Sequence, residues 1–483
     1  MLLDRRTFLF SSAALAGCAS APGGDGDDAF RALAETLPDL DVHARWEAVR
    51  RFDARALTPQ GRVLHAAIAP GAEAEAALAR LGYDANPYAV THRNGEHRRP
   101  APDAAAVARE TAQLERDAAR GVIAPDFVLE AAIGSVEAAA ARAIPEAREA
   151  LLQQSATLRA LAARAAPDAS VTRLPDGQEY YRAALQLQLG AAIDPHAAHD
   201  QTAAQAAAFS AEAQILLRSV GVSRGSASEG LSTLIRAQRP GARDAALGEM
   251  RAVLARAPEL IAPAFSTPPP AAEIIALPQA EEANGARGRR EGDAYIVDLG
   301  GWRPRWTLAS VVYHETIPGH LLQAAHEARS NTPPIVRRYA AGYSEGWATY
   351  AEMLADELGG FAHDPLARLG YLHWMLFRMA RVVADTGMHA LSWSRTRAIA
   401  EMHALQGESI AFVSIEEDVT RIAAQPAIAA AQGLAALNIL AQRERAGRRA
   451  AFTLPAFHDA MLTHGPIGAA GVTQSAAAAF GAV

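Results

Sequence analysis

The chain has 483 residues, of which half are apolar, 20% are charged and 6% are aromatic. Much of the apolar share is alanine, which has the highest intrinsic helix propensity, so a mostly helical globular protein is expected. A formal net charge of -7 provides no basic surface for nucleic acid, and we expect no nucleic-acid partner. The single cysteine, Cys18, excludes an internal disulfide and a cysteine-rich metal site.

The N-terminus carries two features of an export signal. Arg5 and Arg6 precede a short apolar run that ends at Cys18, a pattern that resembles a twin-arginine signal joined to a lipoprotein cleavage box. The run is shorter than the stretch of about 20 residues that crosses a membrane, so it is not a permanent span. We predict a signal peptide over 1–17, a lipid-modified Cys18 and a flexible tether over 18–28. The mature protein would be a periplasmic or cell-envelope lipoprotein, held at the membrane only through that cysteine; the alternative is an ordinary N-terminus with a chance pair of arginines.

The rest of the chain divides into two helical halves. Amphipathic segments broken by proline and glycine fill the N-terminal half, 29–265. Examples of expected helices are 104–120, 147–165 and 199–220. A proline-rich and then polar stretch predicts a connector over 266–292, and helical periodicity fills most of the C-terminal half, 293–483. The predicted fold is a mostly α, multi-helix protein.

One short segment differs from its helical surroundings. Residues 294–299 alternate like a strand and stop at Gly300. A single strand among helices cannot build a sheet-based fold. We expect an edge strand that lines a cleft, where an extended peptide could pair with it.

An apolar helix is expected to end in His314 and Glu315. A neutral imidazole binds zinc, and an adjacent carboxylate can take a proton from a metal-bound water. The next histidine, His320, is six residues on, which on a continuous helix is about 120° away and unable to share the metal. Pro318 and Gly319 favour a helix break that could return His320 to the site. The alternative is two unrelated histidines.

The following predicted helix, 342–354, offers a third ligand. Glu345 and Glu352 lie one heptad apart in this apolar segment. Three protein ligands with a free position for water are typical of catalytic zinc, so we assign Glu345 as the third ligand of one zinc ion per chain. Glu352 could orient a ligand from behind it. Alternatively, both carboxylates lie on a solvated helix face.

Three polar residues recur at intervals of four on a later helix. Arg381, Asp385 and His389 therefore share one helical face. Arg381 could hold a substrate carboxylate, and His389, oriented by Asp385, could stabilise transition-state charge. The same stripe could equally form a buried salt-bridge network.

Together these segments resemble the domain-of-unknown-function 885 family of bacterial proteins, which is grouped with the zincin-type metallopeptidases. The matching motifs are His314-Glu315-x-x-Pro318-Gly319-His320-x-x-Gln323, Glu345-Gly346-Trp347-Ala348-x-Tyr350-Ala351-Glu352 and Arg381-x-x-x-Asp385-Thr386-Gly387-x-His389. The resemblance implies a largely helical fold with a deep groove, a His-His-Glu zinc site and peptide-bond hydrolysis. Carried over by position, it makes His314, His320 and Glu345 the zinc ligands and Glu315 the catalytic base.

The sequence departs from the family pattern at two places. Leu321 replaces the second of two paired histidines, which leaves the required His320. In the late motif, Ile428 stands for the family's glutamine and Gln432 for its tyrosine. If that tyrosine stabilises an oxyanion, Gln432 would substitute for it only in part, because an amide lacks the acidity of a phenol.

The sequence thus predicts a zinc-dependent peptidase that hydrolyses peptides in the cell envelope, with activity lowered by Gln432. One alternative is a non-catalytic or weakly active peptide-binding lipoprotein of the same fold. Another is a zinc hydrolase of a different amide or an ester. The sequence indicates neither the oligomeric state nor whether cleavage is internal or terminal.

Overall fold

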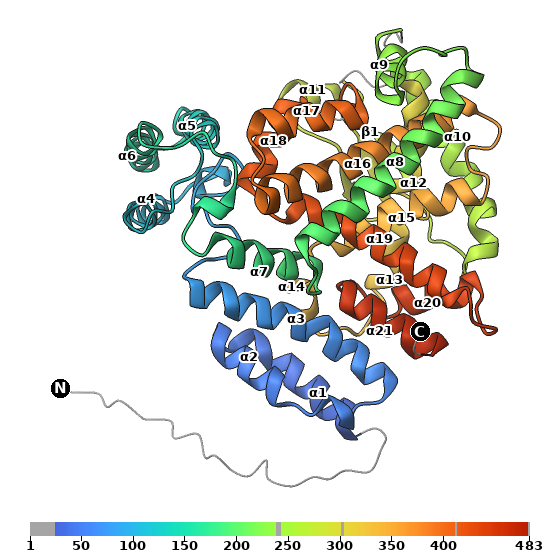
Figure 1. Cartoon of the computed structure of the whole chain (residues 1–483), viewed down its shortest axis with the longest axis horizontal. Coiled ribbons are helices and arrows are strands. Elements are labelled where there is room, and N and C mark those ends of the chain that lie inside the picture. Colours follow the sequence, from blue (N-terminus) through green and yellow to red (C-terminus); the bar gives the residue numbers. More distant parts are fainter. Residues whose placement is uncertain (1–24, 238–242, 301–303, 411–412, 482–483) are drawn as a thin grey trace.

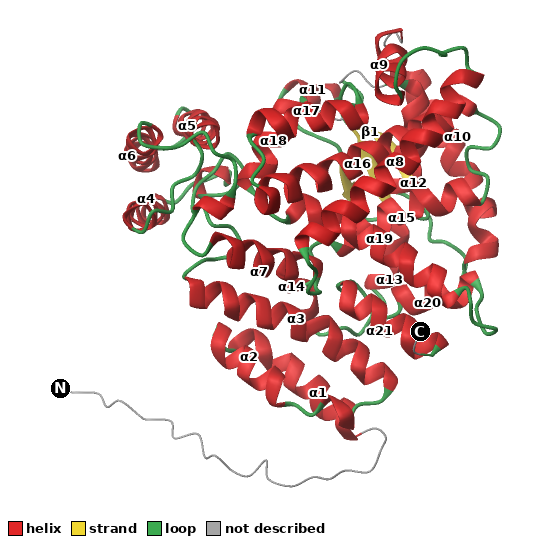
Figure 2. Cartoon of the chain, in the orientation of Figure 1, coloured by secondary structure: helices red, strands yellow, loops and turns green. Residues whose placement is uncertain are grey.

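The computed structural model describes residues 25–237, 243–300, 304–410 and 413–481 (Figure 1). The predicted signal peptide and Cys18 lie outside these residues. The described chain is mostly helical, with one small sheet, as the composition predicts (Figure 2).

The first ten helices precede the sheet. Their bounds are α1 Asp25–Thr36, α2 Val42–Arg51, α3 Pro59–Leu81, α4 Ala104–Ala119, α5 Asp126–Ala140, α6 Pro145–Ala162, α7 Gly177–Leu189, α8 Pro195–Ser219, α9 Ala227–Ala237 and α10 Arg243–Ile261. The helices predicted over 104–120, 147–165 and 199–220 are confirmed as α4, α6 and α8. Helices α4, α5 and α6 pack together as a group at one side of the molecule, whereas α1 and α2 pack on α3 (Figure 1).

The start of α1 corrects the predicted tether. Residues 25–28, expected to belong to it, form the first turn of this helix. Three aspartates in that turn suit the positive end of the helix dipole. Asp27 also accepts hydrogen bonds from the backbone amide and hydroxyl of Thr58, which ties the turn to the start of α3.

The sheet has three strands rather than the one that was expected. Strands β1 (Glu273–Ala276), β2 (Arg289–Glu291) and β3 (Ala294–Val297) form a sheet in the order β1-β3-β2. β3 is parallel to β1 and antiparallel to β2, so the predicted edge strand is instead the central one. All four residues of β3 are buried, and buried backbone groups need partners on both sides. The predicted connector therefore contains two strands and the short helix α11 (Gln279–Ala283).

The last ten helices follow the sheet. They are α12 Leu308–Glu315, α13 His320–Glu327, α14 Ile335–Arg338, α15 Tyr343–Glu357, α16 Pro365–Leu391, α17 Arg395–Gln406, α18 Ile415–Ala424, α19 Ile428–Ala446, α20 Leu454–Leu462 and α21 Ala469–Phe480. Short 3-10 turns occur at Leu37–Asp39, Ala54–Ala56, Glu96–Arg98, Val171–Arg173, Ala262–Ala264 and Arg305–Thr307. Of the described helices, none is by itself long and apolar enough to cross a membrane; α18 and α19 are so only when taken together, and a 95° bend separates them.

The two predicted halves share one continuous core. Helix α16 packs along α8, α21 along α3, and α19 against α7 and α15. Gly190 and Gly468 bring the two halves into backbone contact, because a Cβ at Gly190 would lie 2.7 Å from the Cα of Gly468. Helix α16 lies within this core and forms a wall of the site described next.

Candidate metal centre

The predicted interruption after Glu315 is present. Helix α12 ends at Glu315 and α13 begins at His320. Gly319 permits the close turn between them, since a Cβ there would lie 1.9 Å from the carbonyl oxygen of His314. The indole of Trp347 donates a hydrogen bond of 3.0 Å to the carbonyl oxygen of Pro318. Helix α15 therefore fixes the same turn that reorients His320.

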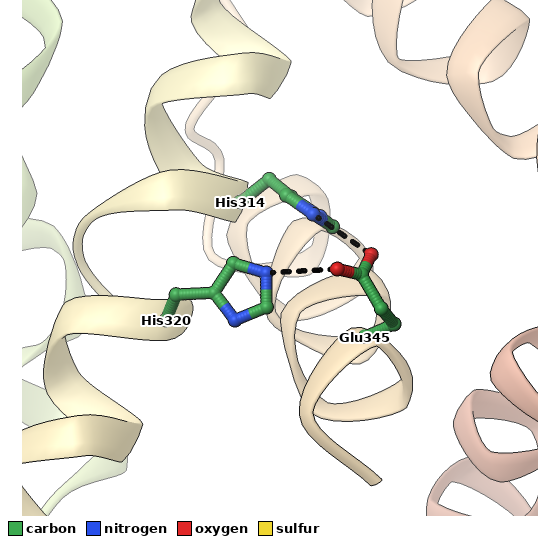
Figure 3. A group of neighbouring side chains, drawn as sticks. All are labelled: His314, His320 and Glu345. Atoms are coloured by element: carbon green, nitrogen blue, oxygen red, sulfur yellow. Dashed lines mark ion pairs between the residues drawn. The ribbon is translucent and has the colours of Figure 1, made fainter. Parts of the chain in front are cut away.

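Three side chains from three helices converge beside this turn. His314 comes from the end of α12, His320 from the start of α13, and Glu345 from the first turn of α15 (Figure 3). Nε2 of His314 lies 3.5 Å from Oε2 of Glu345, and Nε2 of His320 lies 3.6 Å from Oε1. One donor atom from each residue lies within 4.8 Å of the other two.

The geometry and chemistry of this group fit a zinc ion. Zinc–ligand distances of about 2.0–2.1 Å and tetrahedral angles separate ligand atoms by roughly 3.3–3.4 Å, close to the two observed separations. Nε2 of His320 is buried and, among the described residues, has no hydrogen-bond partner. A buried polar atom without a partner is costly unless a further ligand satisfies it. Two imidazoles and a carboxylate are also a common donor set for catalytic zinc.

Helix α15 orients His314 from behind. Nδ1 of His314 lies 2.8 Å from Oε1 of Glu352, whose side chain is fully buried. Two groups approach this Nδ1, namely Oε1 of Glu352, which only accepts, and Nη2 of Arg378 at 2.8 Å, which only donates. With the proton on Nδ1, Glu352 accepts it and Nε2 keeps a lone pair for a metal ion. Ser310 donates to the other oxygen of Glu352, and Arg378 lies 2.7 Å from Oε1. Glu352 thus has the orienting position predicted for it.

A second set of hydrogen bonds orients His320. Nδ1 of His320 lies 3.1 Å from the hydroxyl of Ser344, which donates to Oε1 of Gln323 at 2.9 Å. The serine proton is therefore engaged, and its oxygen accepts from the imidazole. Both histidines consequently present Nε2 to Glu345.

The ionisation of the three side chains reflects their mutual contact. Burial opposes charge on His314, but Glu345 and Glu352 raise its pKa to about 9. Burial lowers the pKa of His320. Burial would raise the pKa of Glu345, yet the two imidazoles hold it well below its usual range. A metal ion would displace the proton that a charged His314 carries on Nε2, so metal affinity should rise with pH.

The group opens into a cavity of about 330 Å³. His314, Glu315 and Glu345 line it together with helices α16, α18 and α19. The other lining residues are Tyr295, Val311, Thr349, Glu352, Trp374, Phe377, Arg378, Arg381, Arg421, Ala429, Gln432 and Gly433. Glu315 reaches the cavity from the last turn of α12, where Arg290 of β2 lies 2.5 Å from its Oε2. The predicted base therefore lines the same cavity as two of the three predicted ligands, His314 and Glu345, whereas His320 lies beside them and does not line it.

The predicted stripe on α16 is divided between two environments. Arg381 lines the cavity and pairs with Asp418 at 3.1 Å. Asp385 is fully buried and accepts from the hydroxyl of Tyr181 at 2.9 Å. It also accepts from the backbone amides of Ala427 and Ala430, each at 3.1 Å. Asp385 therefore holds the start of α19 instead of orienting His389, which corrects its predicted role.

His389 also differs from its predicted role. It is fully buried and does not line the cavity. Its Nδ1 accepts from the backbone amide of Val171 and its Nε2 donates to the carbonyl of Ile422, each at 3.4 Å. Two turns of α16 beyond Arg381 carry His389 past the cavity, so it joins packed elements and does not face a substrate.

Gln432, which stands for the family's tyrosine, lines the same cavity as His314 and Glu345. It lines the cavity from the second turn of α19, and Ala427 precedes that helix with a φ of 72°. This left-handed conformation is one that glycine adopts freely and that other residues adopt rarely. Alanine therefore occupies a strained position that the hydrogen bond to Asp385 helps to maintain.

Several residues of the site were not predicted from the sequence. Arg378 lies one helical turn before Arg381, so an i,i+3 search would have found it. Ser344 precedes Glu345 directly and could have been found by its place in the motif. Arg290 and Ser310 gave no such signal, because they reach the site through tertiary contacts.

Residues 97–474 match the model of a family described as bacterial protein of unknown function (DUF885). The chain belongs to this family. The fold of this chain is similar to that of a putative lipoprotein from Colwellia psychrerythraea, with 21% identity, a TM-score of 0.75 and coverage of 93% of this chain and 95% of the other. A putative lipoprotein of unknown function from Shewanella oneidensis has 18% identity, a TM-score of 0.68 and coverage of 91% of both chains. Among curated proteins, none shows significant sequence similarity.

Proposed function

We propose that this DUF885 protein is a zinc-dependent peptidase. The observation that carries the proposal is the convergence of His314, His320 and Glu345 at the wall of a cavity that Glu315 also lines. Structural zinc sites are usually closed by four protein ligands, whereas catalytic ones keep a position open. A group of three ligands, two of which line a cavity, fits the second class.

The residues around the metal position have distinct roles in this proposal. Bound zinc would lower the pKa of water and polarise the substrate carbonyl. Glu315 takes a proton from the attacking water as a C–O bond forms at the carbonyl carbon. The same carboxyl returns that proton to the departing nitrogen as the C–N bond breaks, so one water yields an acid and an amine. In this proposal Gln432, which lines the cavity, donates its amide to the developing oxyanion.

The proposed place of action is the cell envelope. The twin arginines and Cys18 support export and lipid attachment, and both solved relatives are described as putative lipoproteins. The described domain begins with α1 seven residues after Cys18, so it would act close to the membrane surface.

A second candidate is a binding protein that keeps the metal but does not cleave. The observation that favours it is Gln432, because an amide is a weaker oxyanion donor than the tyrosine of the family pattern. Loss of one such donor lowers turnover by about two to three orders of magnitude. A zinc hydrolase of another amide or an ester would use the same residues.

Metal analysis and a peptide pool test the proposal. Elemental analysis of protein folded with zinc should find about one ion per chain, lost in His320→Ala and Glu345→Ala and kept in Glu315→Gln. A diverse peptide pool read by mass spectrometry should show cleavage by wild type and none by Glu315→Gln. Zinc binding without cleavage would favour the binding protein, and absence of zinc would overturn both.

A further inference from the structure

Beyond the metal position, two arginines line the cavity without a carboxylate partner for each. Arg381 from α16 and Arg421 from α18 both line it. Arg93 lies near both, since Arg381 helps to lower the pKa of Arg93, and Arg93 helps to lower the pKa of Arg421. The carboxylates that interact with Arg421 are Asp418 and Glu345, and Glu345 is assigned to the metal. The two lining guanidinium groups, with Arg93 near them, therefore share one remaining carboxylate, that of Asp418.

Arg421 is the least compensated of the three. Within the described ranges, its guanidinium makes no hydrogen bond or ion pair. Burial, followed by repulsion from Arg381 and Arg93, lowers its pKa to about 10. Holding a partly buried cation beside two like charges is unfavourable unless an anion joins them. An anionic ligand would supply the missing partner.

Arg381 is already fixed in place to receive such a ligand. Its guanidinium lies 5.5 Å from the ring centre of Phe377 and 3.1 Å from the carboxylate of Asp418. A guanidinium held in this way loses little freedom when it binds an anion. Arg378, by contrast, is engaged by Glu352 and is not available.

We propose that Arg381 and Arg421 form a carboxylate-binding subsite that receives the C-terminal carboxylate of the peptide. This proposal rests on the proposed peptidase function and deepens it. A planar guanidinium matches a carboxylate through two parallel hydrogen bonds. Because the metal position and both arginines share a cavity at the small end of the range for ligand pockets, only a short stretch of substrate fits between them. The scissile bond therefore lies near the carboxyl end of the substrate.

The walls of the cavity are consistent with this orientation. Trp374 and Phe377 provide apolar surface next to the arginines, and Tyr295 provides more from β3. A C-terminal residue with an apolar side chain would thus find both contacts it needs, namely guanidinium groups for its carboxylate and rings for its side chain.

Peptides that differ only at the C-terminus test the subsite. Zinc-loaded wild type is given one apolar-ended peptide as the free acid, as the C-terminal amide, and as the amide with an internal glutamate. We expect release of the last one or two residues from the acid, and a kcat/KM about 10- to 100-fold lower for both amides. Equal cleavage of acid and amide would overturn the proposal. Efficient cleavage of the glutamate-containing amide would overturn the C-terminal assignment in favour of an acidic side chain.

Variants connect this preference to the arginines. Arg421→Gln should lower kcat/KM for the acid about 10- to 100-fold, leave the amide unchanged and retain one zinc, whereas Arg421→Lys should recover part of the loss. Arg445→Gln, an exposed change on α19, is the matched control and should behave as wild type. A preference for the acid that survives in Arg421→Gln and Arg381→Gln would overturn the assignment.

A binding measurement separates this proposal from the peptidase proposal. Calorimetry with the zinc-loaded Glu315→Gln protein should show tighter binding of the acid than of the amide. The added change Arg421→Gln should remove that difference. This result would support the subsite even if wild type cleaved no peptide, whereas cleavage without any carboxylate dependence would support the peptidase and overturn the subsite.

Discussion

At the scale of single residues, Glu352 is a buried carboxylate that contacts a proposed zinc ligand and is not itself one of the three proposed ligands. It accepts the Nδ1 proton of His314 and so selects the tautomer that presents Nε2. Glu352→Gln should weaken zinc binding about 10- to 100-fold, because an amide is a poorer acceptor for an imidazole than a carboxylate. Competition with a chelator would measure the change in Kd.

The control for this prediction lies on the same helix. Glu357→Gln removes an exposed carboxylate of α15 that pairs with Arg443 and not with a histidine. It should leave the Kd for zinc at the wild-type value. An unchanged Kd in Glu352→Gln would show that His314 is oriented by other contacts.

The ionisation of Asp385 should contribute to the pH dependence of the free energy of unfolding. Burial raises the pKa of its carboxyl to about 6, above the ordinary 3.8, although three hydrogen bonds oppose the shift. The folded state therefore holds the proton more tightly than the unfolded state, and this group makes stability fall as pH rises from about 4 to 6. The largest change expected from this shift is about 3 kcal/mol.

Urea unfolding of wild type and Asp385→Asn at pH 4.5 and pH 6.5 would measure this contribution. Asparagine does not titrate, so the variant should lack the part of the change in unfolding free energy between the two pH values that Asp385 causes. Because it also loses an acceptor for α19, the variant should be less stable than wild type at the lower pH. Parallel pH slopes in the two proteins would refute the assigned ionisation.

At the scale of elements, the break between α12 and α13 creates the site. A Cβ at position 319 would lie 1.9 Å from the carbonyl oxygen of His314, so Gly319→Ala should force the turn apart and move His320. Zinc content should fall well below one ion per chain, and the free energy of unfolding should drop by more than 1 kcal/mol. Gly134→Ala is the control, because nothing lies within 4 Å of its added Cβ in the middle of α5.

The elements that the sequence predicts well are those with a local cause. Proline and glycine at 318 and 319 act on their own turn, so the helix break could be predicted from them alone. Strands β1 and β2 have only four and three residues, which is too short for a clear alternation. Their pairing with β3 is tertiary, and for this reason a central strand was predicted as an edge.

The difference between local and tertiary causes also explains why Arg381 lines the cavity and His389 does not. Periodicity correctly places both on one face of α16, but a face of 27 residues passes several environments. Which part of it meets the cavity depends on where α18 and α19 cross the helix. No pattern within α16 contains that information.

At the scale of the whole molecule, the metal position joins three helices of a core that both halves build. An ion held by α12, α13 and α15 binds the folded chain and not the unfolded one, so zinc should stabilise the protein by about 2.7 kcal/mol at a free concentration of 100 times its Kd. Removal of zinc with a chelator should therefore lower Tm by several degrees, and addition of zinc should restore it.

Two variants identify the origin of this stabilisation. Glu315→Gln should keep the full zinc-dependent shift in Tm, since Glu315 is not a ligand. His320→Ala should abolish the shift, because a carboxylate and one imidazole bind zinc much more weakly than three ligands. A shift of equal size in His320→Ala would place the stabilising ion elsewhere. Because the ligands come from three helices that pack against one another within the shared core, the loss of one ligand should affect the unfolding of the whole chain and not of α13 alone.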